Sequence, residues 1–498
     1  MLTSLLFGII CTVILYAWGL SVLSIIYPKS ATPYSFHFAY LIGLCTVSLL
    51  TNWATIFSGT NSIIGSFILV APLIYQHRNL SLNKIINDVT PNSISYKFLA
   101  ICLLLTCICI HAWEIKHPDT LTYQNSLIHN AITGPQPIGN IIIKPQLGYG
   151  GAWFPLAATF SFEWLIGKTM TFVNLSLVGV SIIYLINKIE SALNKQQLGS
   201  MIGYLVVLAI GCYEYTFFRL AITSAAPDTP AAILGIATLI YFIKNGRQSW
   251  MLILLSFTAV TIKLSLAPIL LLPVWDLLQK KNMRNWIRCI GVGILIMTPF
   301  FTKNILSTGY AIYPFPASKI LEESFVPEKH KVQEEANYIT AYARNIAVTR
   351  DSSQVKYIAT QSMRQWVPTW WKQLDVADRT VIALFFIGII GCMGAAYRSP
   401  DTLQVQIPVL TVIIIGAFYW FSLAPAIRFG TTFLLAPLLL YSGSKNCITF
   451  ERLTKRTSIR LHKGVMLIST GIVLAYFIYR MINFMDGMSI LLPKGPVS

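Results

Sequence analysis

The sequence predicts an all-α, polytopic helical membrane protein, and both its composition and its apolar segments support this fold class. Hydrophobic residues make up 55% of the chain and charged residues only 11%, which is too little polar surface for a chain that folds in water. Apolar stretches that could each cross a hydrocarbon core of about 30 Å as a helix recur along the whole length. Long strands of alternating polarity, the signature of a membrane β-barrel, do not occur. We therefore expect about 12–13 spans together with short re-entrant or half-span helices.

The candidate spans follow one another with few interruptions. In chain order they cover 2–27, 35–57, 61–76, 97–113, 168–187, 199–217, 230–243, 287–303, 380–396, 406–423, 430–443 and 464–482. The first has no basic segment before it and no small-residue cleavage site, so we interpret it as a retained helix rather than a signal peptide. Two further apolar pieces, 152–166 and 250–278, are shorter or broken. The second breaks around Lys263 and is basic at both ends, which favours a hairpin that enters and leaves on one membrane face.

The positive charges of the chain indicate its orientation. There are 37 Lys and Arg residues against 19 Asp and Glu, but the surplus lies in short loops between spans, which is an orientation signal and no sign of nucleic-acid binding. The basic loops, from Arg78 to the segment 445–463, fall on one face, which we assign to the cytoplasm. Two long loops, 114–151 and 304–379, then face the periplasmic or extracellular side of the cytoplasmic membrane.

This scheme divides the chain into five regions. They are N-terminal spans, 1–113; an outer loop with a candidate catalytic Asp and a half-span, 114–167; central spans with the broken hairpin 250–278, 168–303; a large outer loop with interfacial helices, 304–379; and C-terminal spans with a short outer tail, 380–498. Three tryptophans between Trp366 and Trp371 favour an interfacial helix, although such rings also stack on sugars. The nine cysteines lie in or beside apolar spans, so neither a disulfide framework nor a metal site is expected.

A carboxylate at the mouth of the helix bundle is the strongest indication of function. Asp119 lies near the start of the first long loop, directly after Pro118, which suits the first turn of a helix. The stretch 120–132 has an apolar face that includes Leu121, and on such a helix Asp119 and Tyr123 lie one turn apart on the same side. Asp119 could then accept a proton from an attacking hydroxyl group as a general base. The alternative is that this acid only offsets the helix dipole.

Two further ionisable residues lie in or beside the apolar segments. Asp228, in the outward turn before the span 230–243, is a second candidate catalytic residue, although it would also serve as the N-cap of that helix. Lys263, in the broken hairpin, is a candidate site residue because an ionisable group at membrane depth is usually functional. Lys263 could instead snorkel to the interface or pair with an acid of a loop.

Cations and aromatic rings at two other outward turns complete the candidate site. Lys303 ends a span just before the turn that contains Tyr310, and it could either snorkel or bind a lipid phosphate. Arg428 lies in a short outward turn, against the orientation bias, and its guanidinium group suits a phosphate. The candidates for binding substrate or donor phosphate are therefore Lys263, Lys303, Arg428, Tyr123 and Tyr310.

The order of these sparse motifs resembles that of membrane glycosyltransferases of the GT-C class, which use polyprenyl-phosphate-linked sugars. The motifs are Asp119 with Tyr123, then Pro227-Asp228, Lys263 in the broken hairpin, Asn304 with Gly309-Tyr310 and Tyr313-Pro314, and Arg428-Phe429. Within that class the chain is most similar to poorly characterised bacterial members associated with envelope polysaccharide synthesis. It departs from many members in having several spans before the Asp119 loop, which leaves its family within the class open.

The resemblance implies inverting transfer of a sugar from a polyprenyl-phosphate donor to an envelope glycan or a lipid-linked acceptor. Asp119 would deprotonate the acceptor hydroxyl, while Lys263, Lys303 and Arg428 would stabilise the departing lipid phosphate. Such a donor requires no nucleotide cofactor, and the chain has no Gly-rich phosphate loop. A divalent cation at Asp119 and Asp228 is compatible with the sequence but not required by it. The expected partners are the two substrates and membrane lipids, with no nucleic acid.

Other functions stay open at this point. A polysaccharide repeat-unit polymerase or ligase of the same pathway would share the spans and the large outer loop, but it would depend on cations rather than on Asp119. A lipid-glycan transporter would also be polytopic and carry a broken helix. Transporters usually have paired interruptions in two similar halves, however, and no such symmetry is visible in this sequence. An acyltransferase is a further alternative.

Overall fold

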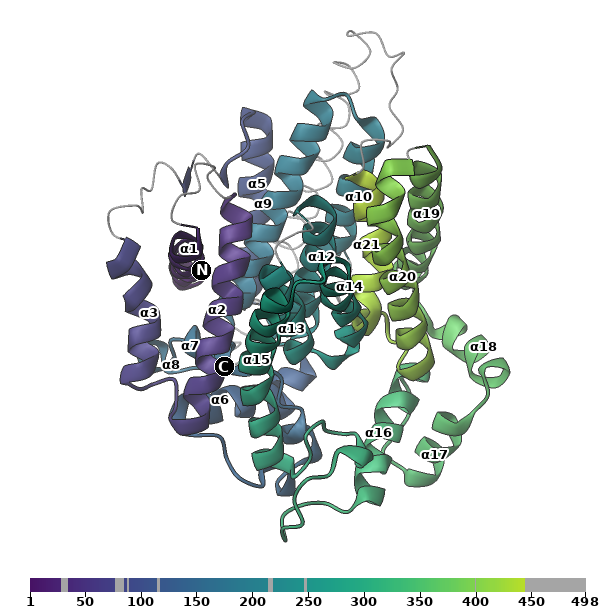
Figure 1. Cartoon of the computed structure of the whole chain (residues 1–498). Helices are drawn as coiled ribbons and strands as arrows, with labels where there is room; N and C mark the ends of the chain where they lie inside the picture. Colours follow the sequence, from purple (N-terminus) through teal and green to yellow (C-terminus); the bar gives the residue numbers. More distant parts are fainter. Residues whose placement is uncertain are drawn as a thin grey trace, which may run out of the picture.

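The secondary structure is helical throughout the part of the chain that the structure describes. The computed structural model describes residues 1–27, 35–76, 85–86, 89–113, 117–213, 218–245, 249–398 and 400–443. Within these ranges there is no strand, only one isolated β-bridge between Tyr310 and Lys319. The long helices form a bundle, and shorter helices gather at its lower end in Figure 1. The predicted all-α class is therefore confirmed.

The bundle contains helices predicted as spans, together with the short helix α11 and the broken hairpin formed by α13, η5 and α14. Their bounds are α1 Leu2–Ile26, α2 Phe36–Phe57, α3 Ile63–Gln76, α5 Ile94–Trp113, α9 Phe172–Asn194, α10 Leu198–Tyr213, α11 Leu220–Thr223, α12 Asp228–Asn245, α13 Ser249–Ile262, η5 Leu264–Leu270, α14 Leu271–Lys280, α15 Met283–Thr308, α19 Val376–Arg398, α20 Pro400–Leu423 and α21 Ile427–Ser442. Among the described helices, seven are long and apolar enough to cross a membrane, namely α1, α2, α5, α9, α15, α19 and α20. These helices confirm a multi-pass membrane protein. The predicted span 464–482 and the basic segment 445–463 lie outside the described residues.

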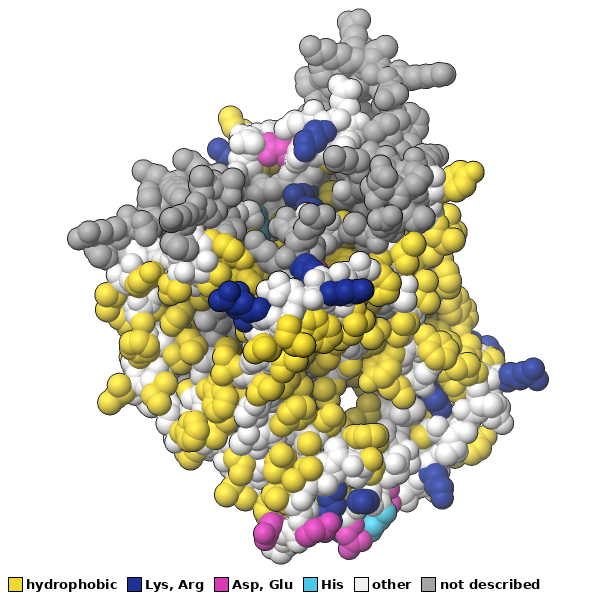
Figure 2. Space-filling view, viewed as in Figure 1, with side chains coloured by type: hydrophobic (Ala, Val, Ile, Leu, Met, Phe, Trp, Pro, Cys, Tyr) yellow, Lys and Arg dark blue, Asp and Glu magenta, His cyan; other side chains and the backbone are white. Residues whose placement is uncertain are grey.

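Apolar side chains cover the outside of the bundle. Figure 2 shows a broad hydrophobic area on this face, with Lys and Arg side chains near the middle of the view and a group of acidic side chains at its lower edge. Large exposed apolar residues include Ile290 and Ile294 on α15 and Phe386 and Ile390 on α19. An apolar surface of this extent would drive association in water, whereas lipid tails solvate it in a bilayer.

The segment from α13 to α14 folds as a broken hairpin. Two helices flank the 3₁₀ segment η5, and Lys263 stands at the break between α13 and η5. The Ser249 hydroxyl at the start of α13 donates to Asp276 Oδ2 of α14 at 2.5 Å, and Lys280 Nζ donates to the same hydroxyl at 2.9 Å. The two ends of the segment therefore lie together, as a hairpin that enters and leaves on one face requires.

Short helices from the two long loops, and from the apolar piece 152–166 that was predicted as a half-span, form a layer at one end of the bundle, called the outer layer below. They are η1 Thr120–Gln124, α6 Asn125–Thr133, η2 Asn140–Ile142, η3 Pro145–Gly148, α7 Trp153–Thr159, α8 Glu163–Ile166, η6 Pro316–Ser318, α16 Lys329–Arg344, α17 Ser352–Thr360 and α18 Met363–Gln373. In Figure 1 both sets lie toward the lower end of the molecule. The loops that the sequence assigned to one membrane side thus share one end of the bundle.

The sequence predicted that the tryptophans of α18 lie at the membrane interface, but two of the three pack inside the protein. Trp366 and Trp370 are 2% and 6% exposed, and their rings lie 5.1 and 5.6 Å from that of Phe421 on α20. Trp370 Nε1 also donates to the carbonyl oxygen of Pro425 at 3.0 Å. Because α20 offers these rings an apolar partner, α18 anchors the turn between α20 and α21.

Two glycines let α1 and α2 approach each other closely. A Cβ atom on Gly19 would lie 1.7 Å from the carbonyl oxygen of Ala39, and one on Gly43 would lie 1.7 Å from that of Leu15. Both obstructing atoms belong to the backbone, so a side chain could be accommodated only by moving a whole helix. Small residues commonly provide such close contacts between membrane helices.

We expect Gly43→Ala to destabilise the protein by about 1–3 kcal/mol, because the added methyl group overpacks the contact between α1 and α2. Gly291→Ala is the matched control, since no heavy atom lies within 4 Å of a Cβ atom at that position and Ala favours a helix over Gly. Thermal unfolding of both variants in one detergent measures the difference. Equal melting temperatures for the two variants would contradict the close-packing argument.

Candidate active site

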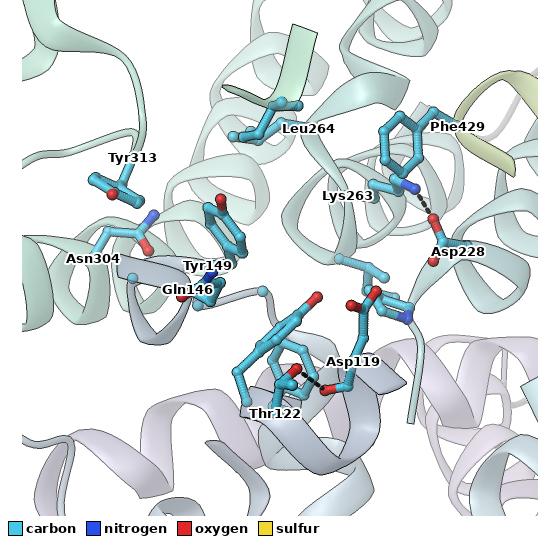
Figure 3. Close-up of a pocket in the computed structure, with 18 of the residues that line it drawn as sticks. Asp119, Thr122, Gln146, Tyr149, Asp228, Lys263, Leu264, Asn304, Tyr313 and Phe429 are labelled. Atoms are coloured by element: carbon cyan, nitrogen blue, oxygen red, sulfur yellow. Dashed lines mark hydrogen bonds and ion pairs between the residues drawn. The ribbon is translucent and has the colours of Figure 1, made fainter. Parts of the chain in front are cut away.

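A cavity of about 460 Å³ lies between the outer layer and the bundle (Figure 3). Its lining comes from the first outer loop, the start of α12, the break of the hairpin, the end of α15, α16 and the start of α21. Among the residues predicted for the site, the lining includes Asp119, Tyr123, Asp228, Lys263 and Arg428. Side chains that are far apart in the sequence therefore meet in one cavity.

A π-helical turn, η1, presents Asp119 and Tyr123 to the cavity. The predicted helix is present, but the turn before α6 has the wider π geometry. Its closing bond runs from the first residue of α6 to the carbonyl oxygen of Thr120. Leu121, which was expected on the apolar face, is 66% exposed because the wide turn shifts the register. Single π turns of this kind are frequent at functional sites.

Asp119 is the more accessible of the two carboxylates in the cavity. Its side chain is 32% exposed, compared with 8% for Asp228. Arg428 Nη1 lies 3.5 Å from Asp119 Oδ2, which is a long contact for a hydrogen bond. Among the described residues, Asp119 Oδ1 accepts no hydrogen bond, so one carboxylate oxygen is available to a substrate.

His117 supports the backbone at Asp119. The Asp119 N–H donates to His117 Nδ1 at 3.2 Å, and the same nitrogen lies 3.6 Å from Asp119 Oδ2. Burial lowers the pKa of His117 from its ordinary value of 6.5, an effect that the Asp119 charge opposes and the Arg428 charge reinforces. The imidazole is therefore neutral at pH 7, and its Nδ1 acts as a hydrogen-bond acceptor.

An ion pair between Lys263 and Asp228 joins the broken hairpin to α12 (Figure 3). Lys263 has an extended backbone, with φ −151° and ψ 115°, where α13 ends and η5 begins. Its Nζ also lies 3.9 Å from the centroid of the Phe429 ring. The Ser265 hydroxyl of η5 donates to the carbonyl oxygen of Phe429 at 3.2 Å. The hairpin, α12 and the start of α21 therefore meet at this pair.

Tyrosine rings line another wall of the cavity (Figure 3). The Tyr149 ring centroid lies 5.9 Å from that of Tyr123 and 5.9 Å from that of Tyr313. The Tyr149 hydroxyl donates to the Glu335 carboxylate of α16, which Arg350 also binds at 2.8 and 3.2 Å. Burial raises the pKa of Tyr123 to about 12. The Tyr123 hydroxyl is therefore protonated at neutral pH and able to donate a hydrogen bond.

Two of the predicted site residues, Lys303 and Tyr310, are not part of the cavity lining. Lys303 is 3% exposed on α15 and donates to Asn52 Oδ1 on α2. Tyr310 is fully buried, and its hydroxyl donates to the carbonyl oxygen of Pro327 at 2.7 Å. Each has a partner that explains its burial. Lys303 directly precedes the lining residue Asn304, and Tyr310 lies three residues before the lining residue Tyr313. Both residues support the wall of the cavity rather than face its interior.

Tyr149, Glu335 and Arg350 were not among the residues predicted from the sequence. Glu335 has no local feature that distinguishes it from the other acids of the large outer loop, and its partner Tyr149 is 186 residues away. The one local signal is the pair of glycines at 148 and 150, which flank Tyr149 and bring the backbone to the cavity surface. In the sequence, only the position of Tyr149 between two glycines of an outer loop could have indicated that it belongs to the site.

The donor set of the cavity does not favour a metal ion. Within the described residues, no group of three or more His, Cys, Asp or Glu side chains could hold one. The two carboxylates to which the sequence would allow a divalent cation each face a protein cation, Asp119 facing Arg428 and Asp228 facing Lys263. A divalent cation held by one or two carboxylates, waters and substrate phosphates would therefore have to displace Arg428 or Lys263 from its carboxylate.

The neutral state of His117 predicts a pH dependence of stability. The pKa of His117 is lower in the folded protein than the ordinary value of 6.5. The stability that comes from keeping His117 neutral is therefore present above about pH 6.5 and is lost as the pH falls through the folded pKa. We expect His117→Asn to make the melting temperature less sensitive to pH between about 7.5 and 5. His330→Asn is the control, because His330 is 61% exposed in the same outer layer. Identical pH profiles for wild type and His117→Asn would contradict the assignment.

Comparison with known proteins places the chain in one family. No curated protein and no solved structure matches it. The model of a family described as a domain of unknown function, DUF8201, matches residues 1–435. That match includes all the elements that build the cavity, from the Asp119 loop to the start of α21. The chain belongs to the DUF8201 family.

Proposed function

We propose that this protein is a membrane glycosyltransferase that transfers a sugar from a polyprenyl-phosphate donor to an envelope glycan or lipid-linked acceptor. The observation that carries the proposal is the juxtaposition of an accessible carboxylate with two cations in one cavity of a membrane protein. Asp119 contacts Arg428, and both lie within electrostatic range of Lys263. An inverting transfer needs such a set, namely a base for the acceptor and positive charge for the leaving group.

Asp119 is the general base in this proposal, and Asp228 is not. Asp228 is nearly buried and paired with Lys263, whereas Asp119 is 32% exposed and has one carboxylate oxygen directed to no protein partner that the structure describes. A base must lie within hydrogen-bonding distance of the acceptor hydroxyl, and only Asp119 has this accessibility. Asp228 instead holds Lys263 at the break of the hairpin.

The proposed step is a single displacement at the anomeric carbon. Asp119 takes the proton of the acceptor hydroxyl, and the acceptor oxygen forms a bond to the anomeric carbon. The bond between that carbon and the phosphate oxygen breaks, and its electron pair leaves with the polyprenyl phosphate. Arg428 and Lys263 stabilise the negative charge that grows on this phosphate. The product has the opposite anomeric configuration because attack and departure occur on opposite faces.

The tyrosine wall is the proposed acceptor site. The rings of Tyr123, Tyr149 and Tyr313 follow one another at 5.9 Å intervals, and aromatic faces of this kind stack on sugar rings. Gln146 and Asn304 supply neutral polar groups beside them. The positive-inside pattern assigns this end of the bundle to the outer face of the cytoplasmic membrane, where lipid-linked sugars and envelope glycans meet.

We expect Asp119→Asn to lower the rate of transfer by about 10²–10⁴-fold, because the amide keeps the shape of the side chain but cannot accept the proton. Glu328→Gln is the matched control, since Glu328 is a 74% exposed carboxylate of the same outer layer. The measurement is release of polyprenyl phosphate by purified protein, together with surface glycans from cells that carry each variant at equal protein level. Full-length glycan in the Asp119→Asn strain would refute Asp119 as the base and favour a polymerase.

We expect Arg428→Ala to raise the KM for the donor by about 10- to 100-fold, which corresponds to loss of a hydrogen bond to a charged group. The KM for the acceptor should change much less. Arg428→Lys should recover part of the affinity because the charge remains while the bidentate geometry is lost. Arg379→Ala is the control, since Arg379 is an exposed cation in the first turn of α19 that binds backbone carbonyl groups of α18. Equal increases of both KM values would contradict a phosphate role.

A further inference from the structure

A second cavity, of about 690 Å³, lies at the other end of α12 from the candidate active site. Asp228 at the start of α12 lines the first cavity, and Lys244 near its end lines the second. The walls of the second cavity come mainly from α2, α9, α10, α12 and α13. Its volume falls in the range of roughly 300–1,000 Å³ that is usual for pockets that bury small ligands.

Helices α9 and α12 each line this cavity with a row of mostly apolar side chains, called a stripe below. On α9 the lining residues are Leu177, Val180, Ser181, Tyr184, Leu185 and Lys188, and on α12 they are Ile233, Ile236, Ala237, Ile240, Tyr241 and Lys244. Both stripes have helical spacing and end in a lysine. From its first residue to its lysine, each stripe covers about 16 Å along the helix axis. This length is about half of a hydrocarbon core of roughly 30 Å, or the depth of one leaflet.

The lysine end of the cavity is positively charged and contains an unpartnered polar atom. Lys188 and Lys244 line it together with His37, and the described lining contains no carboxylate. The Lys188 ammonium group lies 5.3 Å from the centroid of the Tyr184 ring. His37 Nε2 is buried and has no hydrogen-bond partner among the described residues. An apolar body with a cationic, hydrogen-bonding end matches a lipid chain with an anionic head group.

We propose that this cavity binds one acyl chain of an anionic glycerophospholipid from the cytoplasmic leaflet. Lys188 and Lys244 bind the phosphate of the head group, His37 Nε2 hydrogen-bonds to a phosphate or ester oxygen, and the chain occupies the apolar body. The lysines belong to the basic side of the bundle, which the positive-inside pattern assigns to the cytoplasm, and basic pockets between helices on that side bind anionic head groups. This site is separate from the proposed transferase site and stands without it.

The test is lipid retention by the full-length protein, measured by native mass spectrometry after exchange into mixed micelles with equal phosphatidylglycerol and phosphatidylcholine. We expect wild type to retain phosphatidylglycerol preferentially. The double variant Lys188→Gln with Lys244→Gln should weaken this retention by about 30-fold, the equivalent of about 1 kcal/mol per lysine. Ala237→Phe should lower retention by filling the apolar body while it keeps both lysines. Arg284→Gln with Arg288→Gln is the control, because it removes two exposed charges outside the lining.

Several outcomes would overturn the proposal. Retention that is equal for both lipids, or that falls equally in the control variant, would mean that only general surface charge attracts lipid. Displacement of phosphatidylglycerol by glycerol 3-phosphate would mean that the site recognises a free phosphate and no chain. Displacement of phosphatidylglycerol by a polyprenyl phosphate at a concentration far below that of phosphatidylglycerol would assign the cavity to isoprenoid lipids instead. Melting temperatures of the lipid-free variants identify any that fail to fold, and the two cavity variants test independent parts of the site.

Discussion

The ion pair between Lys263 and Asp228 is the interaction on which the candidate active site depends. A helix that breaks within a membrane leaves backbone polar groups without partners, and such a break is tolerated only where it faces protein or a cavity. At Lys263 the hairpin meets α12 and α21, because the ammonium group pairs with Asp228 of α12 and lies over Phe429 at the start of α21. The cavity lies between these three elements and the outer layer.

The outer layer completes the cavity through two long-range attachments. α18 holds the turn before α21 through the bond from Trp370 to Pro425, and this turn leads directly to Arg428. α16 holds Tyr149 through Glu335, whose buried charge Arg350 compensates. One attachment therefore positions the cationic side of the cavity and the other positions its aromatic side, although neither α16 nor α18 crosses the membrane.

Features that depend on neighbouring residues were predictable from the sequence, and features that depend on distant partners were not. The length of the apolar segments predicted the helices. The basic residues at both ends of the broken hairpin predicted that these two ends lie together. Asp119 and Tyr123 were predicted to share one helix and do share the cavity, but the π turn was not foreseen because its register depends on packing. The bond from Lys303 to Asn52 spans 251 residues, and no local pattern distinguishes a lysine that snorkels from one with such a partner.

The length of α12 carries a consequence for how this family can vary. Asp228 begins the helix and Lys244 lies one residue before its end, and each side chain belongs to a different cavity. Adding or deleting one residue between them would rotate one end relative to the other by about 100°, so either the acid or the lysine would turn away from its cavity. Relatives that keep both cavities should therefore tolerate substitutions along α12 but no change in its number of residues.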